Sequence, residues 1–271
     1  MSNRMKKWTR SFIKAATDGA LDLLYPMDCR LCGRKGVGSS VLCMVCWEKI
    51  PLWNGAKCGS CGAPSPDDLD KCGYCPQSKE ANEALGKIRS AGHYSGVLRA
   101  ALLAMKYERK PHMASHFAEM IVRVEPPLYD WGVYEAVVYA PGHRIRRLER
   151  GFDQAALIAR RLAQLIGLPV GSGWLRRVKR TRILARVGDF EARRSELEGV
   201  FKAKLPAKAR GRRLLLADDI VTTGATTGEI AQTLREAGSG PVDVVSAARA
   251  YHPAPFDHEE SALFDRSGNW I

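Results

Sequence analysis

The eight cysteines of this 271-residue chain all lie between positions 29 and 75, and each belongs to a C-x-x-C pair. The pairs are Cys29/Cys32, Cys43/Cys46, Cys58/Cys61 and Cys72/Cys75. One C-x-x-C turn can direct two thiolates at an ion, so two pairs complete the tetrahedral set of a structural zinc site. Disulfide bonds are the alternative, but the chain shows no secretory signal. The pattern therefore predicts about two zinc ions per chain, without indicating which pairs share an ion.

The cysteine-rich segment is short and has few aliphatic residues, so zinc is expected to supply its folding free energy, about 10 kcal/mol per ion. Because cysteine fills every coordination position, these sites are predicted to be structural rather than catalytic. We expect four parts in the chain: an N-terminal amphipathic helix (1–27), a double zinc ribbon (28–80), a larger domain (81–250) and a C-terminal tail (251–271). The N-terminal helix is expected to pack on the protein, with a membrane-surface helix as the alternative.

Composition narrows the class of protein. With 45% hydrophobic residues, the chain can bury a substantial core. No apolar stretch approaches the roughly 20 residues of a membrane span, and the N-terminus lacks an apolar signal core, which predicts a cytoplasmic protein without a transmembrane segment. The net charge of +13 indicates either a solvated basic surface or an anionic partner such as a polyphosphate or nucleic acid.

The larger domain alternates strand-like and helix-like segments. Strands are predicted at 87–94, 136–140, 213–217 and 242–247, and helices at 97–107, 113–124, 154–166 and 229–237. Such alternation is typical of an α/β fold with a mostly parallel sheet and helices on both faces.

The segment LLLADDIVTTGATT, residues 214–227, combines an apolar strand, two carboxylates and a loop rich in threonine. Ligands of open α/β sheets bind at the carboxyl edge of the strands, where Asp218 and Asp219 are expected. A loop leading into a helix binds phosphate through free N–H groups and the helix dipole, and two carboxylates can accept hydrogen bonds from vicinal hydroxyls. A ribose 5-phosphate offers both groups: a phosphate for the loop and vicinal hydroxyls for the two carboxylates. The alternative is an ordinary turn, with Thr226 and Glu229 as a capping box.

The same segment matches the signature of type I phosphoribosyltransferases, which bind phosphoribosyl pyrophosphate (PRPP). The four C-x-x-C pairs are followed by SGVLRAALLAMKY, RRLERGFDQA, LRRVKRTR and the acidic-pair loop, and in this order the chain resembles the ComF family of competence-associated proteins. The resemblance runs from about residue 25 to residue 249. It implies a double zinc ribbon fused to a type I phosphoribosyltransferase-like domain at 81–250, and a link to the uptake or processing of transforming DNA in the cytoplasm.

The resemblance also implies roles for individual residues. The acidic pair would hold ribose hydroxyls, the loop would hold the 5-phosphate, and Mg²⁺ would accompany PRPP. Arginines in and before RGFDQ become pyrophosphate ligands, and residues 176–194 take the place of a mobile hood loop. The candidate PRPP-binding residues are Asp218, Asp219, Thr222, Thr223, Gly224, Ala225, Thr226 and Thr227, and the pyrophosphate candidates are Arg144, Arg147 and Arg150. No catalytic residue can be assigned.

Four positions depart from the family pattern. The family shows proline at Tyr139, asparagine at Asp153, glutamine near Leu184 and asparagine at Glu196. The last two lie in the hood segment, and these departures argue against catalytic turnover. The family's lysine-tyrosine pair is present as Lys106 and Tyr107, with no role that the sequence reveals.

Two functions are consistent with these motifs. The favoured one is a PRPP-binding accessory in the uptake or processing of transforming single-stranded DNA. The partners of such a protein would be PRPP or a related ribose phosphate, single-stranded DNA and DNA-uptake proteins. The alternative is an active phosphoribosyltransferase that moves a phosphoribosyl group from PRPP to an unidentified acceptor. Fold alone does not choose between them.

Overall fold

A computed structural model describes residues 28–29, 31–35, 42–50, 52, 58–63, 84–108, 110–124, 130–143, 147–148, 150–179, 181 and 195–250. The predicted N-terminal helix and C-terminal tail, Cys72, Cys75, Arg144 and Leu184 lie outside these residues. Residue contacts divide the chain into two compact units, one of residues 1–50 with 264–271 and one of residues 51–263. The four predicted parts of the chain stay a prediction. Within the described residues, no helix is long and apolar enough to cross a membrane.

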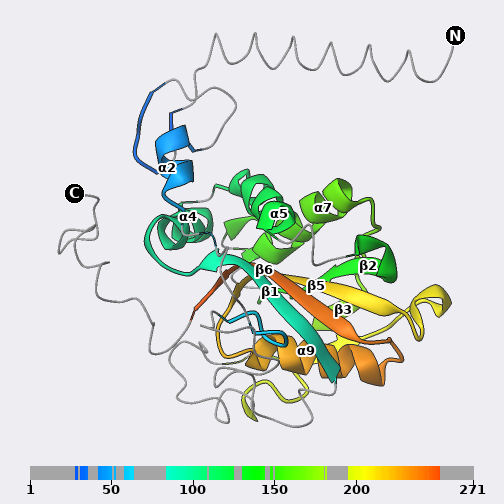
Figure 1. The fold of residues 1–271 in the computed structure, drawn as a ribbon. Helices are drawn as coiled ribbons and strands as arrows, with labels where there is room; N and C mark the ends of the chain where they lie inside the picture. The colour runs from blue at the N-terminus through cyan, green and yellow to red at the C-terminus, as the bar shows by residue number, and fades with distance from the viewer. Residues whose placement is uncertain are drawn as a thin grey trace, which may run out of the picture. The chain divides into compact units, whose positions relative to one another are not determined.

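The larger unit is built on a four-stranded parallel sheet in the order β1-β6-β5-β2 (Figure 1). The strands are β1 (Leu85–His93), β2 (Tyr134–Tyr139), β5 (Arg213–Val221) and β6 (Val242–Arg249). Every residue of β6 is buried, as expected for a central strand with both faces covered. A separate antiparallel pair is formed by β3 (Leu175–Arg177) and β4 (Phe201–Ala203). The predicted α/β fold with a mostly parallel sheet is confirmed.

Helices cover both faces of this sheet (Figure 1). On one face α5 (Met113–Val124) packs beside α7 (Gln154–Ile166), and α4 (Gly96–Tyr107) contacts α5 and β1. The other face carries α9 (Ala225–Glu236), which also contacts β4. Short 3₁₀ helices, η1 (Trp131–Val133) and η3 (Ala207–Ala209), precede β2 and β5. The smaller unit contributes α2 (Met44–Glu48).

The strand that carries the acidic pair is longer than predicted. It continues to Val221 because β6 continues beside it, with Asp218 opposite Ser246 and Val221 opposite Arg249. On the other side β2 ends at Tyr139, opposite Ala217, so the acidic pair extends beyond β2. The carboxylates therefore lie within β5, past the end of one neighbouring strand, rather than after the strand.

The helix after the loop starts earlier than predicted. Gly224 is its N-cap, with a left-handed φ of 83°, and the helix begins at Ala225. Glycine adopts this conformation without the steric cost of a Cβ, which allows a loop of only three residues between β5 and α9. The capping box proposed for Thr226 and Glu229 is wrong, because both lie inside the helix and a Glu229 carboxylate oxygen accepts from the Gly199 amide at 3.1 Å.

Candidate functional site

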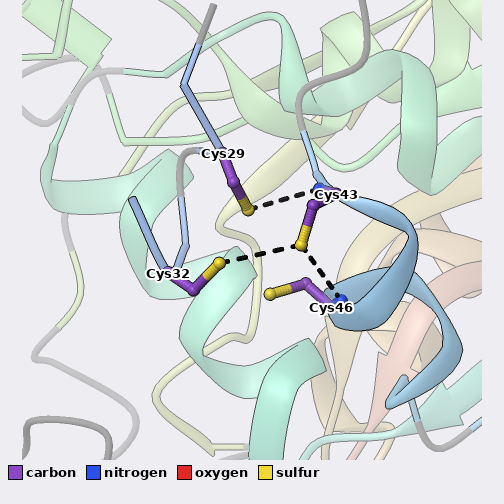
Figure 2. A group of neighbouring side chains, drawn as sticks. All are labelled: Cys29, Cys32, Cys43 and Cys46. Atoms are coloured by element: carbon purple, nitrogen blue, oxygen red, sulfur yellow. Dashed lines mark hydrogen bonds between the residues drawn. The ribbon is translucent and has the colours of Figure 1, made fainter. Parts of the chain in front are cut away.

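Four cysteines of the smaller unit converge on one point. The sulfurs of Cys29, Cys32, Cys43 and Cys46 all lie within 4.8 Å of one another and face a common centre (Figure 2). The Cys32 and Cys43 sulfurs are 3.7 Å apart, close to the ~3.8 Å edge of a tetrahedron with Zn–S bonds of ~2.3 Å. The donor set thus fits zinc, and the first two C-x-x-C pairs together supply the four sulfurs of one candidate site.

Backbone and burial act on these thiols in opposite directions. Burial raises the pKa of Cys29, but hydrogen bonds from the amides of Cys32, Cys43 and Leu31 outweigh it and lower the pKa to about 6. Burial and the neighbouring thiols raise the pKa of Cys46. Four thiolates so close together repel one another, and a bound cation stabilises the ionised form of all four at once.

Replacing Cys32 with serine is expected to remove about one of about two zinc ions per chain, because a structural site with three thiolates holds zinc far less tightly. The check is metal analysis of the purified full chain under reducing conditions. Met44→Ser is the matched control, because Met44 is exposed on α2 and its sulfur is not in the cluster. Equal zinc content in Cys32→Ser and wild type would contradict the assignment.

The third C-x-x-C pair, Cys58/Cys61, forms a turn of the same kind in the larger unit. The first cysteine's amide donates to the carbonyl five residues on, at 2.7 Å for Cys29 and 2.8 Å for Cys58. The glycine four residues on donates back to the cysteine, at 2.9 Å for Gly33 and 3.0 Å for Gly62, and both glycines have positive φ. Residues 58–63 are therefore a second knuckle with the backbone geometry of the first.

The acidic pair has a buried counter-charge that the sequence did not reveal. The Lys106 ammonium, in the last turn of α4, lies 3.0 Å from an Asp219 carboxylate oxygen, and the two side chains are 19% and 15% exposed. Only the fold brings α4 to the end of β5. The lysine of the Lys106-Tyr107 pair thus has a clear structural role, namely to hold Asp219.

The two carboxylates differ in their ionisation. Burial and then the charge of Asp219 raise the pKa of Asp218 well above its usual range. Burial alone would also raise the pKa of Asp219, but the Lys106 ammonium outweighs it and lowers this pKa. Burial would lower the pKa of Lys106, and the Asp219 charge raises it overall. Asp219 is therefore the ionised member of the pair at neutral pH, while Asp218 resists ionisation.

Asp218 gives the protein a testable dependence on pH. A carboxyl with a raised folded-state pKa stabilises the fold below its unfolded pKa of about 3.9, and this contribution is lost as the pH rises through the folded value. Asp218→Asn keeps an oxygen to accept from the Asp219 amide, at 2.8 Å in the wild type, and removes the titration. Relative to wild type, the variant should gain stability as the pH rises above about 4, by at most ~1.4 kcal/mol per pH unit.

Denaturant unfolding at a series of pH values, from the unfolded-state pKa of about 4 upward, measures that difference. Asp130→Asn is the control, since Asp130 is an exposed N-cap whose oxygen also accepts from a backbone amide. A difference between Asp218→Asn and wild type that stays constant with pH would show that Asp218 titrates normally.

The loop after the acidic pair contains hydroxyls in different environments. Thr222 is exposed, and Thr223 accepts from the Ala225 amide at 3.4 Å. Thr227 is buried and donates to the Gly224 carbonyl at 3.0 Å, so its hydroxyl already has a partner. Thr226 is half-buried in the first turn of α9.

A pocket of about 450 Å³ opens beside the acidic pair. It brings Asp219 and Thr222 together with two of the predicted pyrophosphate arginines, Arg147 and Arg150. Among the described residues, Asp218 and residues 223–227 are not part of its lining. Among the residues that the structure describes, the lining consists of Tyr94, Leu103, Lys106, Tyr107, Gly142, His143, Arg147, Arg150, Phe152, Asp153, Gln154, Arg177, Thr181, Asp219, Ile220 and Thr222.

Neighbouring side chains hold Arg150 in place. Its guanidinium lies over the Tyr107 ring, 5.6 Å from the ring centre, and donates to the Gln154 side-chain oxygen at 2.9 Å. Such stacking fixes a planar cation with little desolvation. Tyr107 is thus the second residue whose role required the structure. Gln154, the last residue of RGFDQ, also lines the pocket, although no sequence argument selected it.

Asp153, where the ComF pattern has asparagine, links two parts of the pocket. It caps α7 by accepting from the Ala156 amide at 3.3 Å and accepts from the Gly142 amide at 3.0 Å. Both bonds need only a side-chain oxygen, which aspartate and asparagine share. Burial raises the pKa of Asp153, and the two amide bonds oppose that rise.

The fold and the cysteine sites define the class of protein: an α/β protein with a parallel sheet and an N-terminal double zinc ribbon. The family model "Double zinc ribbon domain" matches residues 20–77. The chain is 27% identical over 222 residues to competence protein F of Haemophilus influenzae, covering 80% of this chain and 94% of that protein. It is 28% identical over 228 residues to DNA utilization protein YhgH of Escherichia coli K12, covering 82% and 96%. These homologues confirm the resemblance to the ComF family.

Proposed function

We propose that this protein binds Mg²⁺-PRPP in the pocket beside the acidic pair, and that it serves as a cytoplasmic accessory in the uptake or processing of transforming single-stranded DNA. One observation carries the ligand: a single pocket collects an ionised carboxylate, the start of the α9 loop and two arginines. A sugar with neighbouring hydroxyls and two phosphate-bearing ends matches that combination.

Each part of the ligand has a partner of suitable chemistry. Asp219 accepts from ribose hydroxyls. The 5-phosphate lies at the side of the pocket lined by Thr222, from which it reaches Thr223 and the amides in the first turn of α9 beyond the described lining. The guanidinium groups of Arg147 and Arg150 bind pyrophosphate oxygens. Mg²⁺, when bound with PRPP, neutralises part of the pyrophosphate charge.

Gln154 supports an oxygen-rich ligand. Its side chain is 9% exposed and lines the pocket, and within the described residues its Nε2 group has no hydrogen-bond partner. A buried donor without a partner costs about 1–3 kcal/mol. A phosphate or ribose oxygen of the ligand would satisfy it.

The DNA role is supported by the homologues and by charge. Competence protein F and DNA utilization protein YhgH carry DNA-related names, and the net charge of +13 favours polyanions. The proposed partners are accordingly single-stranded DNA and DNA-uptake proteins, and the proposed location is the cytoplasm.

An active phosphoribosyltransferase is the second candidate. It is favoured by aromatic residues in the pocket lining, Tyr94 and Phe152, which suit contact with a planar acceptor. Arg177 and Thr181, from the segment expected to form the hood, also line the pocket. In that case Arg147 and Arg150 would stabilise the departing pyrophosphate.

Thermal unfolding with and without Mg²⁺-PRPP tests the ligand. Preferential binding to the folded protein should raise the melting temperature, by several degrees at ~100 times Kd. The double variant Asp219→Asn/Thr223→Val should lose the shift and stay folded. A full response in the double variant would place the ligand elsewhere.

Single-stranded DNA binding, measured on the same preparation at several salt concentrations, tests the second half of the proposal. Each phosphate contact should contribute about 0.7 to the slope of log affinity against log salt. Affinity that does not change with salt, or no binding at low salt, would remove DNA from the proposed role.

A further inference from the structure

The second knuckle is held by two buried arginines of the sheet. Arg89 on β1 donates to the Gly59 carbonyl at 2.9 Å and to the Ser60 carbonyl at 3.4 Å. Arg249 at the end of β6 donates to the Cys61 carbonyl. Three successive carbonyls of the knuckle are thus bound by guanidinium groups that are only 7% and 2% exposed.

The knuckle also rests directly on β1. The Ile88 amide donates to the Ser60 carbonyl at 2.9 Å, and a Cβ on Gly62 would lie only 2.5 Å from the Ile88 carbonyl oxygen. Cys58 and Cys61 are buried in the same hydrophobic core as residues of the sheet. The second knuckle is therefore a structural part of the larger unit.

Arg249 connects this knuckle to the pocket through its own backbone. Its carbonyl accepts from the Tyr94 amide at 2.9 Å, and the next amide, that of Ala250, donates to the Val221 carbonyl at 2.9 Å. Tyr94 lines the pocket, and Val221 immediately precedes Thr222, which also lines it. Arg249 therefore binds the knuckle with its side chain, and the peptide group that joins it to Ala250 binds the backbones of Tyr94 and Val221.

We propose that Arg249 is a positioning residue that couples metal binding at the second knuckle to the order of the pocket. In a zinc site that includes Cys58 and Cys61, thiolate charge in excess of the ion's own charge would favour the two buried guanidinium groups that bind the knuckle carbonyls. Without metal, the Cys58 and Cys61 turn loses its fixed ligand geometry, and with it the carbonyls that bind Arg89 and Arg249. Relaxation of Arg249 then weakens the bond from the Tyr94 amide to the Arg249 carbonyl and the bond from the next amide, that of Ala250, to the Val221 carbonyl.

This coupling does not depend on which ligand the pocket binds. It must also act in both directions, so a ligand that orders the pocket increases the affinity of the second knuckle for its metal. The first cysteine cluster lies in the other unit and provides a matched control.

Amide hydrogen exchange of the zinc-loaded full chain tests the coupling without any ligand. The informative amides are those of Tyr94 and Ala250, and the amides of Leu214–Leu216 report on the core of the sheet. Cys61→Ser is expected to speed exchange at Tyr94 and Ala250 by at least about tenfold, more than at residues 214–216. Cys32→Ser should lose metal without this change. Equal exchange at Tyr94 and Ala250 in both variants would overturn the proposal.

Because Cys61 is buried, a second pair of variants leaves the ligand cysteines intact. Arg249→Met removes the donor to the Cys61 carbonyl, whereas Arg249→Lys keeps a charge and one donor. Arg249→Met should show the fast exchange at Tyr94 and Ala250, together with faster zinc transfer to a chelator, and Arg249→Lys should restore part of both. If Arg249→Met behaves as wild type, or if exchange rises equally at residues 214–216, Arg249 does not couple the two sites. Failure of PRPP binding would leave these results unchanged, so the two proposals can fail separately.

Discussion

Replacing Lys106 with methionine is expected to lower the free energy of unfolding by about 2–3 kcal/mol at neutral pH. The change leaves Asp219 without the ammonium that lies 3.0 Å away, beside a second carboxyl at Asp218. Removing one member of a fully buried pair strands the other charge and costs about 3–5 kcal/mol. The partial exposure of this pair, 19% and 15%, places the expected cost below that range. Denaturant unfolding measures it.

The control for Lys106→Met is Lys208→Met. Lys208 is 60% exposed and lies 3.8 Å from a Glu135 oxygen, so breaking this surface pair should cost less than about 1 kcal/mol. Adding Asp219→Asn to Lys106→Met should recover part of the lost stability, since the stranded charge is then gone. Additive effects of the two changes would show that Lys106 does not hold Asp219.

Replacing both Arg147 and Arg150 with alanine is expected to weaken Mg²⁺-PRPP binding about 100-fold or more. Hydrogen bonds to charged groups contribute about 1.5–3 kcal/mol each, and a factor of ten corresponds to about 1.4 kcal/mol. Ribose 5-phosphate, which has no pyrophosphate, should lose little affinity. The measurement is competitive titration of both ligands against wild type and variant.

Arg160→Ala is the control for that variant. Arg160 is an exposed arginine of α7 and does not line the pocket, so its removal changes net charge without removing a proposed contact. Equal losses for PRPP and ribose 5-phosphate in the double variant would mean that the arginines act only through long-range charge.

Strong local signals in the sequence predicted much of the fold. The periodicity of residues 154–166 and 113–124 predicted both helices with the observed bounds. The C-x-x-C spacing predicted that cysteine pairs combine, but not that the first two pairs do so. The end of β5 was placed four residues early, because its last residues are held by β6 rather than by their own apolar pattern. The start of α9 was placed late, because a left-handed Gly224 permits a shorter loop than the threonines suggested.

The candidate site was predicted less completely than the fold. Asp219, Thr222, Arg147 and Arg150 belong to motifs and meet in one pocket. Lys106 joins them only because the end of α4 reaches the acidic pair, a tertiary contact between positions far apart in the chain. The arginines under the second knuckle were likewise beyond prediction, since nothing in a strand sequence indicates that a guanidinium binds carbonyls of a distant turn.

Calorimetric titration of the full chain with Mg²⁺-PRPP tests the proposed function most directly, because it measures affinity and stoichiometry together. The expected result is saturable binding at about one site per chain, the number of acidic-pair pockets. Asp219→Asn/Thr223→Val should abolish it, and ribose 5-phosphate should bind more weakly than PRPP. The absence of saturable heat at several temperatures from wild-type protein that carries its zinc, or unchanged binding by the double variant, would contradict PRPP binding at the acidic pair.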